Sequence, residues 1–251
     1  MTIMSVGVYT LSLDPGPDYG SGYLSLTVGK DGNVKATGKL ADGTSVSATS
    51  PLMYDEDNGW FAYLYAAPSA YKGGAFAAVV GFDGYAGRVT LPCGPALWSS
   101  RNAQATGEYG EGFMRDVAFT GAYYSKLDTL RKYYEALRFT ADSPTLNGAG
   151  ATAGTSGEIA VDAQGKFVID KDAGLTLSFA QATGIFKGGS TLVFDAKTKK
   201  KVSFEGIVVQ GEDEMRGFYL WDASSSYNDP KSGKEKAYKY KQSFPVTLIA
   251  E

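Results

Sequence analysis

The chain of 251 residues contains no histidine and a single cysteine, Cys93. Without histidine, Ser-His and Cys-His nucleophile pairs and histidine-ligated zinc, copper or non-haem iron are excluded. One cysteine allows neither an intrachain disulfide nor a thiolate metal cluster. Any catalysis must therefore come from carboxylates, Lys, Tyr or Ser, or from an oxygen-ligated metal, and the sequence indicates no cofactor.

Strong charge and long apolar runs are also missing. The net charge is −3 and the pI is near 5.2, which provides no electrostatic footprint for nucleic acid. No leader and no membrane-spanning run is visible, and both a cytoplasmic protein and a secreted protein whose leader is not present in this chain would look like this. The 32 Gly and 17 Tyr on short alternating segments favour a secreted or cell-surface β-protein.

Period-2 alternation bounded by turn residues is the main pattern of the chain. In "GVYTLSLD" it places Tyr9, Leu11 and Leu13 on one face of a strand. Asp31-Gly32 and Asp42-Gly43 join three further strand-like runs, because such pairs supply the positive φ angles of tight hairpins. The sequence predicts an all-β protein built from an antiparallel meander.

One segment, "YSKLDTLRKYYEALRF" (124–139), predicts a short helix near 125–137. Ser125 and Asp128 form a Ser-x-x-Asp capping box, and Leu127, Leu130, Tyr134 and Leu137 follow at helical spacing. Alternatively, "YYEALRFT" continues as a strand.

A Gly/Ala-rich stretch, "ADSPTLNGAGATAGTSG" (141–157), has almost nothing to bury and predicts a linker. It divides the chain into a domain at 1–140 and a second at 158–251. We expect two antiparallel barrel-like or sandwich units, or one larger barrel through strand exchange. The terminal strand "SFPVTLIA" is expected to pair with an early strand and so seal an edge.

The two halves share a weak internal likeness, which predicts a duplicated β-meander. Alternatively, it is a chance likeness between two β-hairpin regions. Residues 31–65 can be laid on 183–221, with strand, charged hairpin, strand, acidic turn and aromatic strand in the same order. The superposed pairs are Gly32 and Gly184, Val34 and Phe186, Leu40 and Leu192, and Val46 and Val202.

The pattern "GYLSLTV…DGNVKATGKLADGTSVS", then "ATGEYGEGF", then "ATGIFKGG…VSFEGIVVQ…RGFYLW" resembles β-modules of large bacterial secreted or surface proteins. Such modules often accompany immunoglobulin-like or adhesion-type repeats. The resemblance implies an extracellular module and carries no catalytic residues over to this chain.

Glu108 and Glu111 stand three residues apart in "GEYGEG", where the glycines argue against a helix. In a strand these two side chains point to opposite faces, so they do not form a pair acting on one bond. If the strand includes residue 109, Glu111 and Arg115 share its apolar face and could hold a polar ligand in a lumen or cleft. Alternatively, the glycines make a bulge and the strand starts near Phe113.

Aromatic side chains are the other candidates for a binding site. In "GWFAYLYAA", Phe61, Tyr63 and Tyr65 share one strand face, and in "GFYLWDASSSYND" Tyr219 and Trp221 share one. These side chains are either covered or, for some of them, exposed as a stacking platform for sugar rings. Trp98 lies in a loop-like context and is equally a core residue or a ligand contact. The predicted ligand-binding residues are Trp98, Arg101, Asn102, Glu111, Arg115, Tyr219 and Trp221.

For a metal, Asp55 and Asp57 begin a pattern like a calcium loop, but the glutamate that such a loop requires is missing, and a solvated hairpin turn is the alternative. The stretch 221–242 reads as a long polar insertion between strands, a solvated hairpin.

Three functions follow as hypotheses. The first is a non-catalytic extracellular module that binds carbohydrate or another surface polymer, or that spaces other domains. The second is a glycoside hydrolase whose carboxylates come from Glu108, Glu111 and Asp116, which requires two carboxyl groups about 5–10 Å apart across a cleft. The third is a barrel that holds a small ligand in its lumen.

Overall fold

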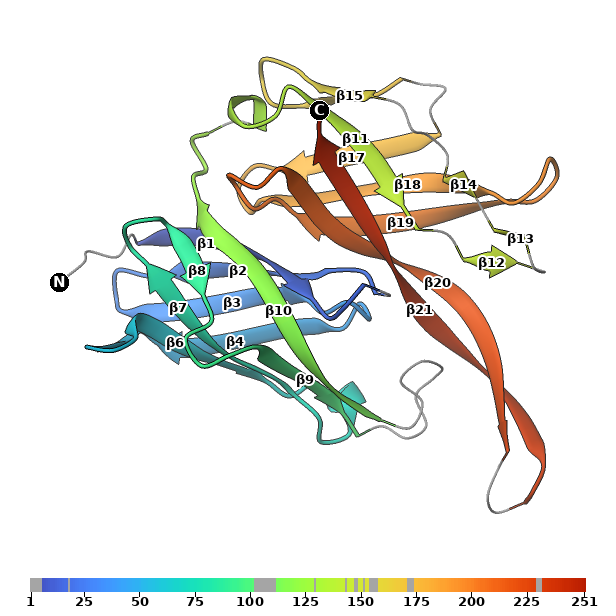
Figure 1. Cartoon of the computed structure of the whole chain (residues 1–251), viewed down its shortest axis with the longest axis horizontal. Coiled ribbons are helices and arrows are strands. Elements are labelled where there is room, and N and C mark those ends of the chain that lie inside the picture. The colour runs from blue at the N-terminus through green and yellow to red at the C-terminus, as the bar shows by residue number, and fades with distance from the viewer. Residues whose placement is uncertain are drawn as a thin grey trace.

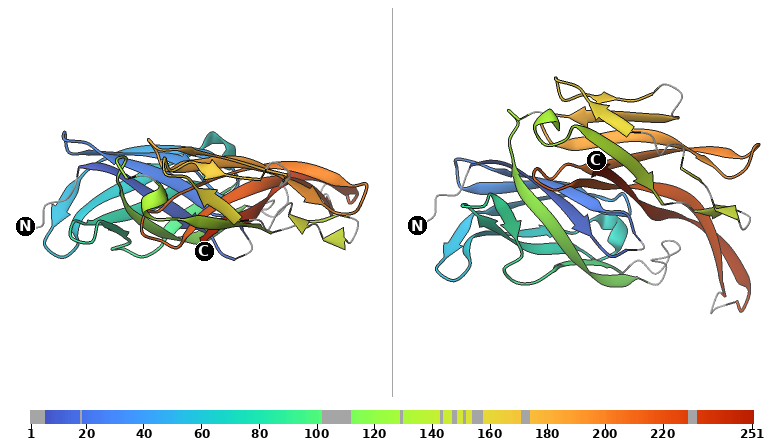
Figure 2. Two further views of the ribbon diagram at one scale, coloured as in Figure 1. Left: turned by 90° about the horizontal axis from the view of Figure 1, so that it is seen from above. Right: turned by 45° about the horizontal axis from the view of Figure 1, so that its top comes forward.

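Two antiparallel sheets, which follow one another along the chain, form the computed structural model (Figure 1). The structure describes residues 6–17, 19–101, 112–128, 130–142, 144–146, 149–150, 152–153, 158–170, 174–228 and 232–251. Seen from above in Figure 2, the sheets lie side by side in one flattened body. The predicted all-β fold with two antiparallel units is confirmed.

The first sheet is a meander whose first and last strands pair with each other. It contains β1 (Gly7–Asp14), β2 (Gly22–Val28), β3 (Asn33–Lys39), β4 (Ser45–Pro51), β5 (Met53–Asp55), β6 (Gly59–Ala66), β7 (Phe76–Asp83), β8 (Arg88–Thr90), β9 (Ala96–Ser100) and β10 (Phe113–Tyr124). The strand order is β4-β3-β2-β1-β10-β8-β7-β6-β5, and β9 pairs with both β10 and β7. A 3-10 turn, η1 (Ser69–Tyr71), precedes β7.

Alternation fills the inside of this sheet with one hydrophobic core. Tyr9, Leu11 and Leu13 of β1 are each at most 1% exposed, as their spacing predicts. Burying a side chain of this size contributes about 1.5–3 kcal/mol. The turns predicted at Gly32 and Gly43 are present, with φ of 77° and 82°. The first sheet is therefore strongly curved, with its inward-facing side chains packed together on the concave side.

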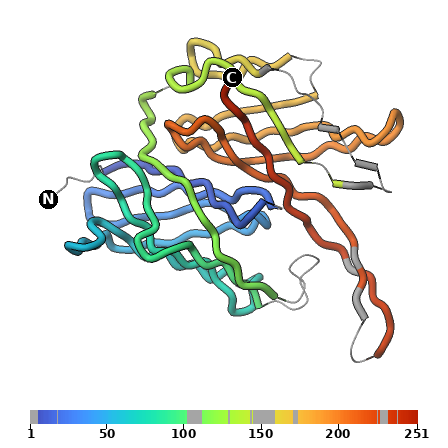
Figure 3. Tube along the Cα trace, viewed as in Figure 1, coloured from blue at the N-terminus to red at the C-terminus, as the bar shows by residue number. Residues whose placement is uncertain are grey.

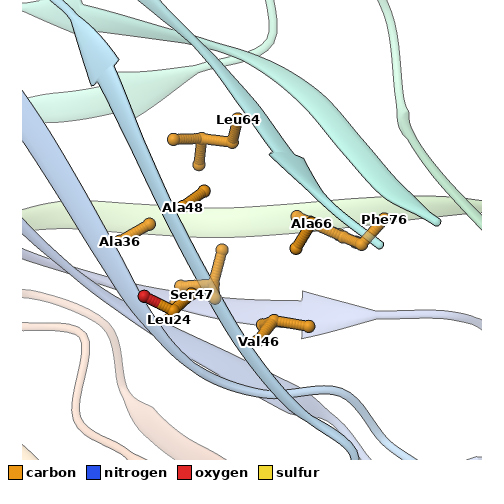
Figure 4. A pocket seen from close by; sticks show the side chains of 8 residues that line it. All are labelled: Leu24, Ala36, Val46, Ser47, Ala48, Leu64, Ala66 and Phe76. Carbon is orange, nitrogen blue, oxygen red and sulfur yellow. The ribbon is translucent and has the colours of Figure 1, made fainter. Parts of the chain in front are cut away.

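The curved first sheet nearly closes into a barrel, because β4 comes close to β6. There the Tyr63 amide donates a hydrogen bond to Ser50 Oγ at 3.2 Å. Beside this seam lies a small apolar hollow with a cavity volume of about 10 Å³, lined by Leu24, Ala36, Val46, Ser47, Ala48, Leu64, Ala66 and Phe76 (Figure 4). The hollow is smaller than pockets for drug-sized ligands, which are about 300–1,000 Å³. Buried side chains of the first core, among them Leu11, Leu26 and Val80, point into the lumen.

The second sheet repeats the pairing of first strand with last. Its strands are β11 (Ala136–Ala141), β14 (Thr152–Ala153), β15 (Glu158–Val161), β16 (Phe167–Val168), β17 (Leu175–Ala180), β18 (Ile185–Val193), β19 (Lys199–Ile207), β20 (Glu214–Asn228) and β21 (Glu235–Ala250). The order is β14-β18-β19-β20-β21-β11-β15-β16, and β17 pairs with β18. The terminal strand thus pairs with β11, the first strand of its own sheet, and not with a strand of the first sheet. A separate two-stranded ladder joins β12 (Thr145–Leu146) and β13 (Ala149–Gly150).

The helix predicted near 125–137 is wrong. The described part of this segment contains a single 3-10 turn, η3 (Leu130–Lys132), followed by β11. Strand pairing with β21 and β15 supplies the backbone hydrogen bonds that a helix would have supplied. Leu130, Tyr134 and Leu137 are buried, whereas Leu127 is 94% exposed, so the apolar stripe faces the core only in part. The strand alternative is right for residues 136–141.

The chain passes from the first sheet to the second between Tyr124 and Ala136, as the tube in Figure 3 shows. This change lies ahead of the segment 141–157 at which the sequence places a linker. The domain boundary itself stays a prediction. Among the described residues, no helix has the length and apolar character to cross a membrane.

Contact between the two sheets buries a third, smaller core cluster. It consists of Tyr23, Ala122, Ile207, Val209 and Phe218, with Ile185 and Leu220 packed against it. Strand β1 is consequently buried on both faces, since Thr10 and Ser12 are covered as well as Tyr9 and Leu11. A backbone bond from the Ser21 amide to the Gly217 carbonyl, 3.0 Å long, crosses the same contact.

Candidate functional site

Three predicted site residues, Asn102, Glu108 and Glu111, lie outside the described residues. Strand β10 begins at Phe113, directly after Gly112, whose φ is 82°. This start agrees with the second of the two predictions for this segment, in which the strand starts near Phe113.

Arg115 lies on the inner face of β10, as predicted. Phe113, Arg115, Val117 and Phe119 are buried or half-buried, whereas the residues between them are exposed. The Arg115 guanidinium stacks over the Tyr19 ring, 4.3 Å from its centroid, and also donates to the Tyr19 hydroxyl. Asp116 is exposed on the opposite face, so Arg115 and Asp116 cannot serve one ligand together.

Trp98 is a core residue, 1% exposed, on the short strand β9. Its Nε1 donates to the Tyr71 hydroxyl oxygen at 3.1 Å, and Tyr71 donates to Asp42 Oδ2 at 2.8 Å. Burial raises the pKa values of both Asp42 and Tyr71. The Trp98 ring packs edge-on against Phe113, with ring centroids 4.8 Å apart. It has no free face for a ligand from solution.

Tyr219 and Trp221 are likewise covered. Tyr219 is 1% exposed, stacks on Phe244 with centroids 5.3 Å apart, and donates to the Asp142 carbonyl at 2.6 Å. Trp221 is half-buried against Phe194, at 5.6 Å. Their rings stabilise the second core.

The acidic turn between β5 and β6 holds Asp55 and Asp57. Asp55 accepts hydrogen bonds from the Asn58 side chain at 3.0 Å and the Asn58 amide at 2.5 Å, and these bonds hold the pKa of Asp55 below its usual value. Within the described ranges, no group of three or more Cys, Asp or Glu side chains is placed to hold a metal ion. The Asp55 carboxylate therefore stabilises the turn by accepting hydrogen bonds from Asn58.

A different set of exposed apolar side chains lies together on β6. Tyr63 and Tyr65 are 54% and 66% exposed, and Phe61, next to Tyr63 on the same side, is half-buried. The rings of Phe61 and Tyr63 meet edge to face with centroids 5.6 Å apart. The alternation of "GWFAYLYAA" groups these three side chains correctly, and the structure shows that they face outward.

Neighbouring strands leave these rings uncovered. Strand pairing places Ala77 and Val79 of β7 opposite Tyr65 and Tyr63. The row continues from Ala77 to Leu97 of β9 and then to Asp116 of β10. We call this surface the aromatic face; its residues are Phe61, Tyr63, Tyr65, Ala77, Val79, Leu97, Met114 and Asp116. Exposed Arg101 follows β9.

The outer surfaces of β3 and β4 provide a comparison within the same barrel. Their exposed, outward positions carry polar side chains and one proline: Asn33, Lys35, Thr37, Ser45, Ser47, Thr49 and Pro51. The same positions on β6 carry three aromatic rings. Exposed rings in one patch mark an interaction site more often than scattered apolar residues do.

No protein-family model, no curated protein and no solved structure matches this chain.

Proposed function

We propose that the protein is a non-catalytic extracellular module that binds polysaccharide through the aromatic face. The observation that carries the proposal is the exposure of Tyr63 and Tyr65 on β6, in a barrel whose outward positions on β3 and β4 are almost all polar. The extracellular location rests on composition and on the resemblance to bacterial surface modules.

The chemistry of the aromatic face suits sugar rings. The faces of pyranose rings carry C–H groups that pack on aromatic rings, and tyrosine presents such a ring together with a polar hydroxyl. At the border of the face, the exposed carboxylate of Asp116 and the guanidinium of Arg101 can bond to sugar hydroxyls. A ligand bound here would contact the side of the barrel and leave the packed lumen undisturbed.

The proposal is tested by binding of the protein to a panel of immobilised polysaccharides, before and after Tyr63→Ser and Tyr65→Ser are combined. We expect retention on at least one polysaccharide, and a weakening of about tenfold or more in the double variant, since each ring contributes on the order of 1 kcal/mol. Tyr85→Ser is the matched control, because Tyr85 is 92% exposed in the turn between β7 and β8, away from the aromatic face.

The same polysaccharides are assayed for hydrolysis. Turnover that disappears in Asp116→Asn would replace the binding module with the glycoside hydrolase hypothesis. Retention that is unchanged in the double tyrosine variant would refute the aromatic face as the site. A protein that neither binds nor cleaves any member of the panel would contradict polysaccharide binding and leave the spacer hypothesis.

A further inference from the structure

Strands β20 and β21 continue past the second sheet as a two-stranded ribbon, which Figure 1 shows projecting from the body. We call residues 220–228 and 235–243 the arm. Its strands pair from Leu220 with Ser243 to Asn228 with Glu235. The ladder of β19 with β20 ends at Tyr219, and that of β11 with β21 ends at Val246. Neither outer edge of the arm pairs with another strand of the described chain.

An open arm of this kind is thermodynamically unusual. An isolated two-stranded ribbon is marginally stable in water, and three or more strands are needed for independent stability. Along each open edge, every second residue presents its amide and carbonyl groups to solvent, and these groups form a template for another strand. The arm therefore gains stability from any strand that adds to one of its edges.

The two edges differ in charge. Strand β21 carries Lys236, Lys239 and Lys241 along the arm, and lysines on an edge strand discourage pairing. Strand β20 carries Asp222 and then the uncharged run "ASSSYN" (223–228). Asp222 is already engaged by Lys241 of the neighbouring strand. The β20 edge is thus the unprotected one.

We propose that the β20 edge of the arm pairs, antiparallel, with the same edge of a second copy of this chain. A two-fold axis at Ser225 would place Ser224 opposite Ser226 of the second copy, and Asp222 opposite Asn228. No like charges meet in this register, so the edge is complementary to itself, as a symmetric dimer requires. Pairing through β21 about a two-fold axis at Lys239 or Tyr240 would instead place lysines of the two copies opposite each other. The product is a four-stranded sheet with the lysines on its outer strands.

The first test is the mass of the full chain in solution as a function of concentration, by sedimentation equilibrium. We expect a reversible dimer. A monomer at every concentration up to about 1 mM, where association is worth only about 4 kcal/mol, would overturn the proposal.

The second test changes charge on one edge. Ser224→Lys combined with Ser226→Lys would set two lysine pairs directly opposite each other in the dimer, and we expect a dissociation constant about tenfold weaker. Ala237→Lys combined with Gln242→Lys adds the same charge to β21 and is the matched control. Equal weakening in both variants would place the dimer contact elsewhere and refute the pairing.

The third test restores the contact with opposite charge. Ser224→Asp combined with Ser226→Asp gives a variant that repels itself in the same register. Mixed with the Lys variant, it should form a heterodimer tighter than either homodimer, since each lysine then faces an aspartate. Failure of the mixture to associate, with both variants folded by circular dichroism, would contradict the register.

Discussion

The Tyr23 hydroxyl donates a 2.8 Å hydrogen bond to Glu205 Oε2 across the contact between the two sheets, joining residues 182 positions apart. Glu205 also pairs with Lys39 of the first sheet, and Lys187 of its own sheet lies 3.8 Å away. Its side chain is 15% exposed. Burial, reinforced by the bond to Glu205, raises the pKa of Tyr23. The two sheets are therefore joined by a partly buried polar cluster as well as by apolar packing.

Removing the Tyr23 hydroxyl should uncouple part of this contact. We expect Tyr23→Phe to lower the free energy of unfolding by about 1–3 kcal/mol, because the partly buried Glu205 carboxylate loses one of its donors. In a double-mutant cycle with Glu205→Gln, measured by urea denaturation, the two changes should be non-additive. Additive effects would show that the bond contributes nothing. Tyr85→Phe removes an exposed hydroxyl and should leave stability unchanged.

Gly184 lies at the contact between the two sheets, and Gly32, which has a similar backbone conformation away from any neighbour, is its control. Both have positive φ, 77° and 73°, but a Cβ at 32 would meet nothing within 4 Å. A Cβ at 184 would lie 2.9 Å from Thr10 Cγ2 and 3.1 Å from Tyr124 Cε2. We expect Gly32→Ala to cost about 1–2 kcal/mol of backbone strain, and Gly184→Ala to cost about 1–3 kcal/mol more.

Thermal or urea unfolding of both alanine variants measures the difference. Equal costs would mean that the contact beside Gly184 yields without strain, and the packing described for Thr10 and Tyr124 would then be incorrect.

The dependence of stability on pH should contain opposite contributions from different aspartates. Burial raises the pKa of Asp42 above its ordinary 3.8, so the folded state binds this proton more tightly than the unfolded state. The contribution of Asp42 to stability is therefore greatest at low pH and falls as the pH rises from about 4 through the folded-state pKa. Side-chain and backbone hydrogen bonds from Asn33 lower the pKa of Asp31, whose contribution is lost as the pH falls.

Asp42→Asn should remove the first contribution. Measured by urea denaturation, the free energy of unfolding at pH 5 relative to pH 7 should be lower in the variant than in the wild type. Asp31→Asn should leave this difference unchanged and alter the profile only below about pH 4, where Asp31 loses its contribution in the wild type. Identical pH profiles for wild type and Asp42→Asn would refute the burial of the Asp42 carboxyl.

Trp98→Ala distinguishes a core role from a ligand-binding role. A cavity of that size should cost about 3–5 kcal/mol of stability. At temperatures where the variant remains folded, polysaccharide binding should be unchanged, because Trp98 faces away from the aromatic face. Loss of polysaccharide binding in a folded Trp98→Phe variant would instead support the hypothesis that Trp98 contacts the ligand.

Hairpins and strand faces were predictable because they depend on local chemistry. Gly32 and Gly43 adopt the positive φ that their turns require, and the inner face of β10 follows the alternation through Arg115. The six non-glycine residues superposed in the internal likeness are all buried: Val34, Leu40, Val46, Phe186, Leu192 and Val202. Gene duplication itself stays a prediction.

What the sequence did not reveal depends on partners distant along the chain. Strand β11 forms in a segment of helical spacing because β21 pairs with it from more than a hundred residues away. Trp98 follows Gly94-Pro95 and resembles a loop residue, yet pairing of β9 with β7 and β10 buries it. The exposure of Tyr63 and Tyr65 depends on the small residues Ala77 and Val79, and only strand register brings these together.

The continuity of β20 and β21 from the body into the arm has a mechanical consequence. Hydrogen bonds in an antiparallel ladder run across the strands. A pull on the arm along its length therefore loads the bonds of β20 to β19 and of β21 to β11 simultaneously, in shear, and does not open them one after another. Tension on the arm would thus pass directly into the second sheet, close to the place where Phe218 contacts the first.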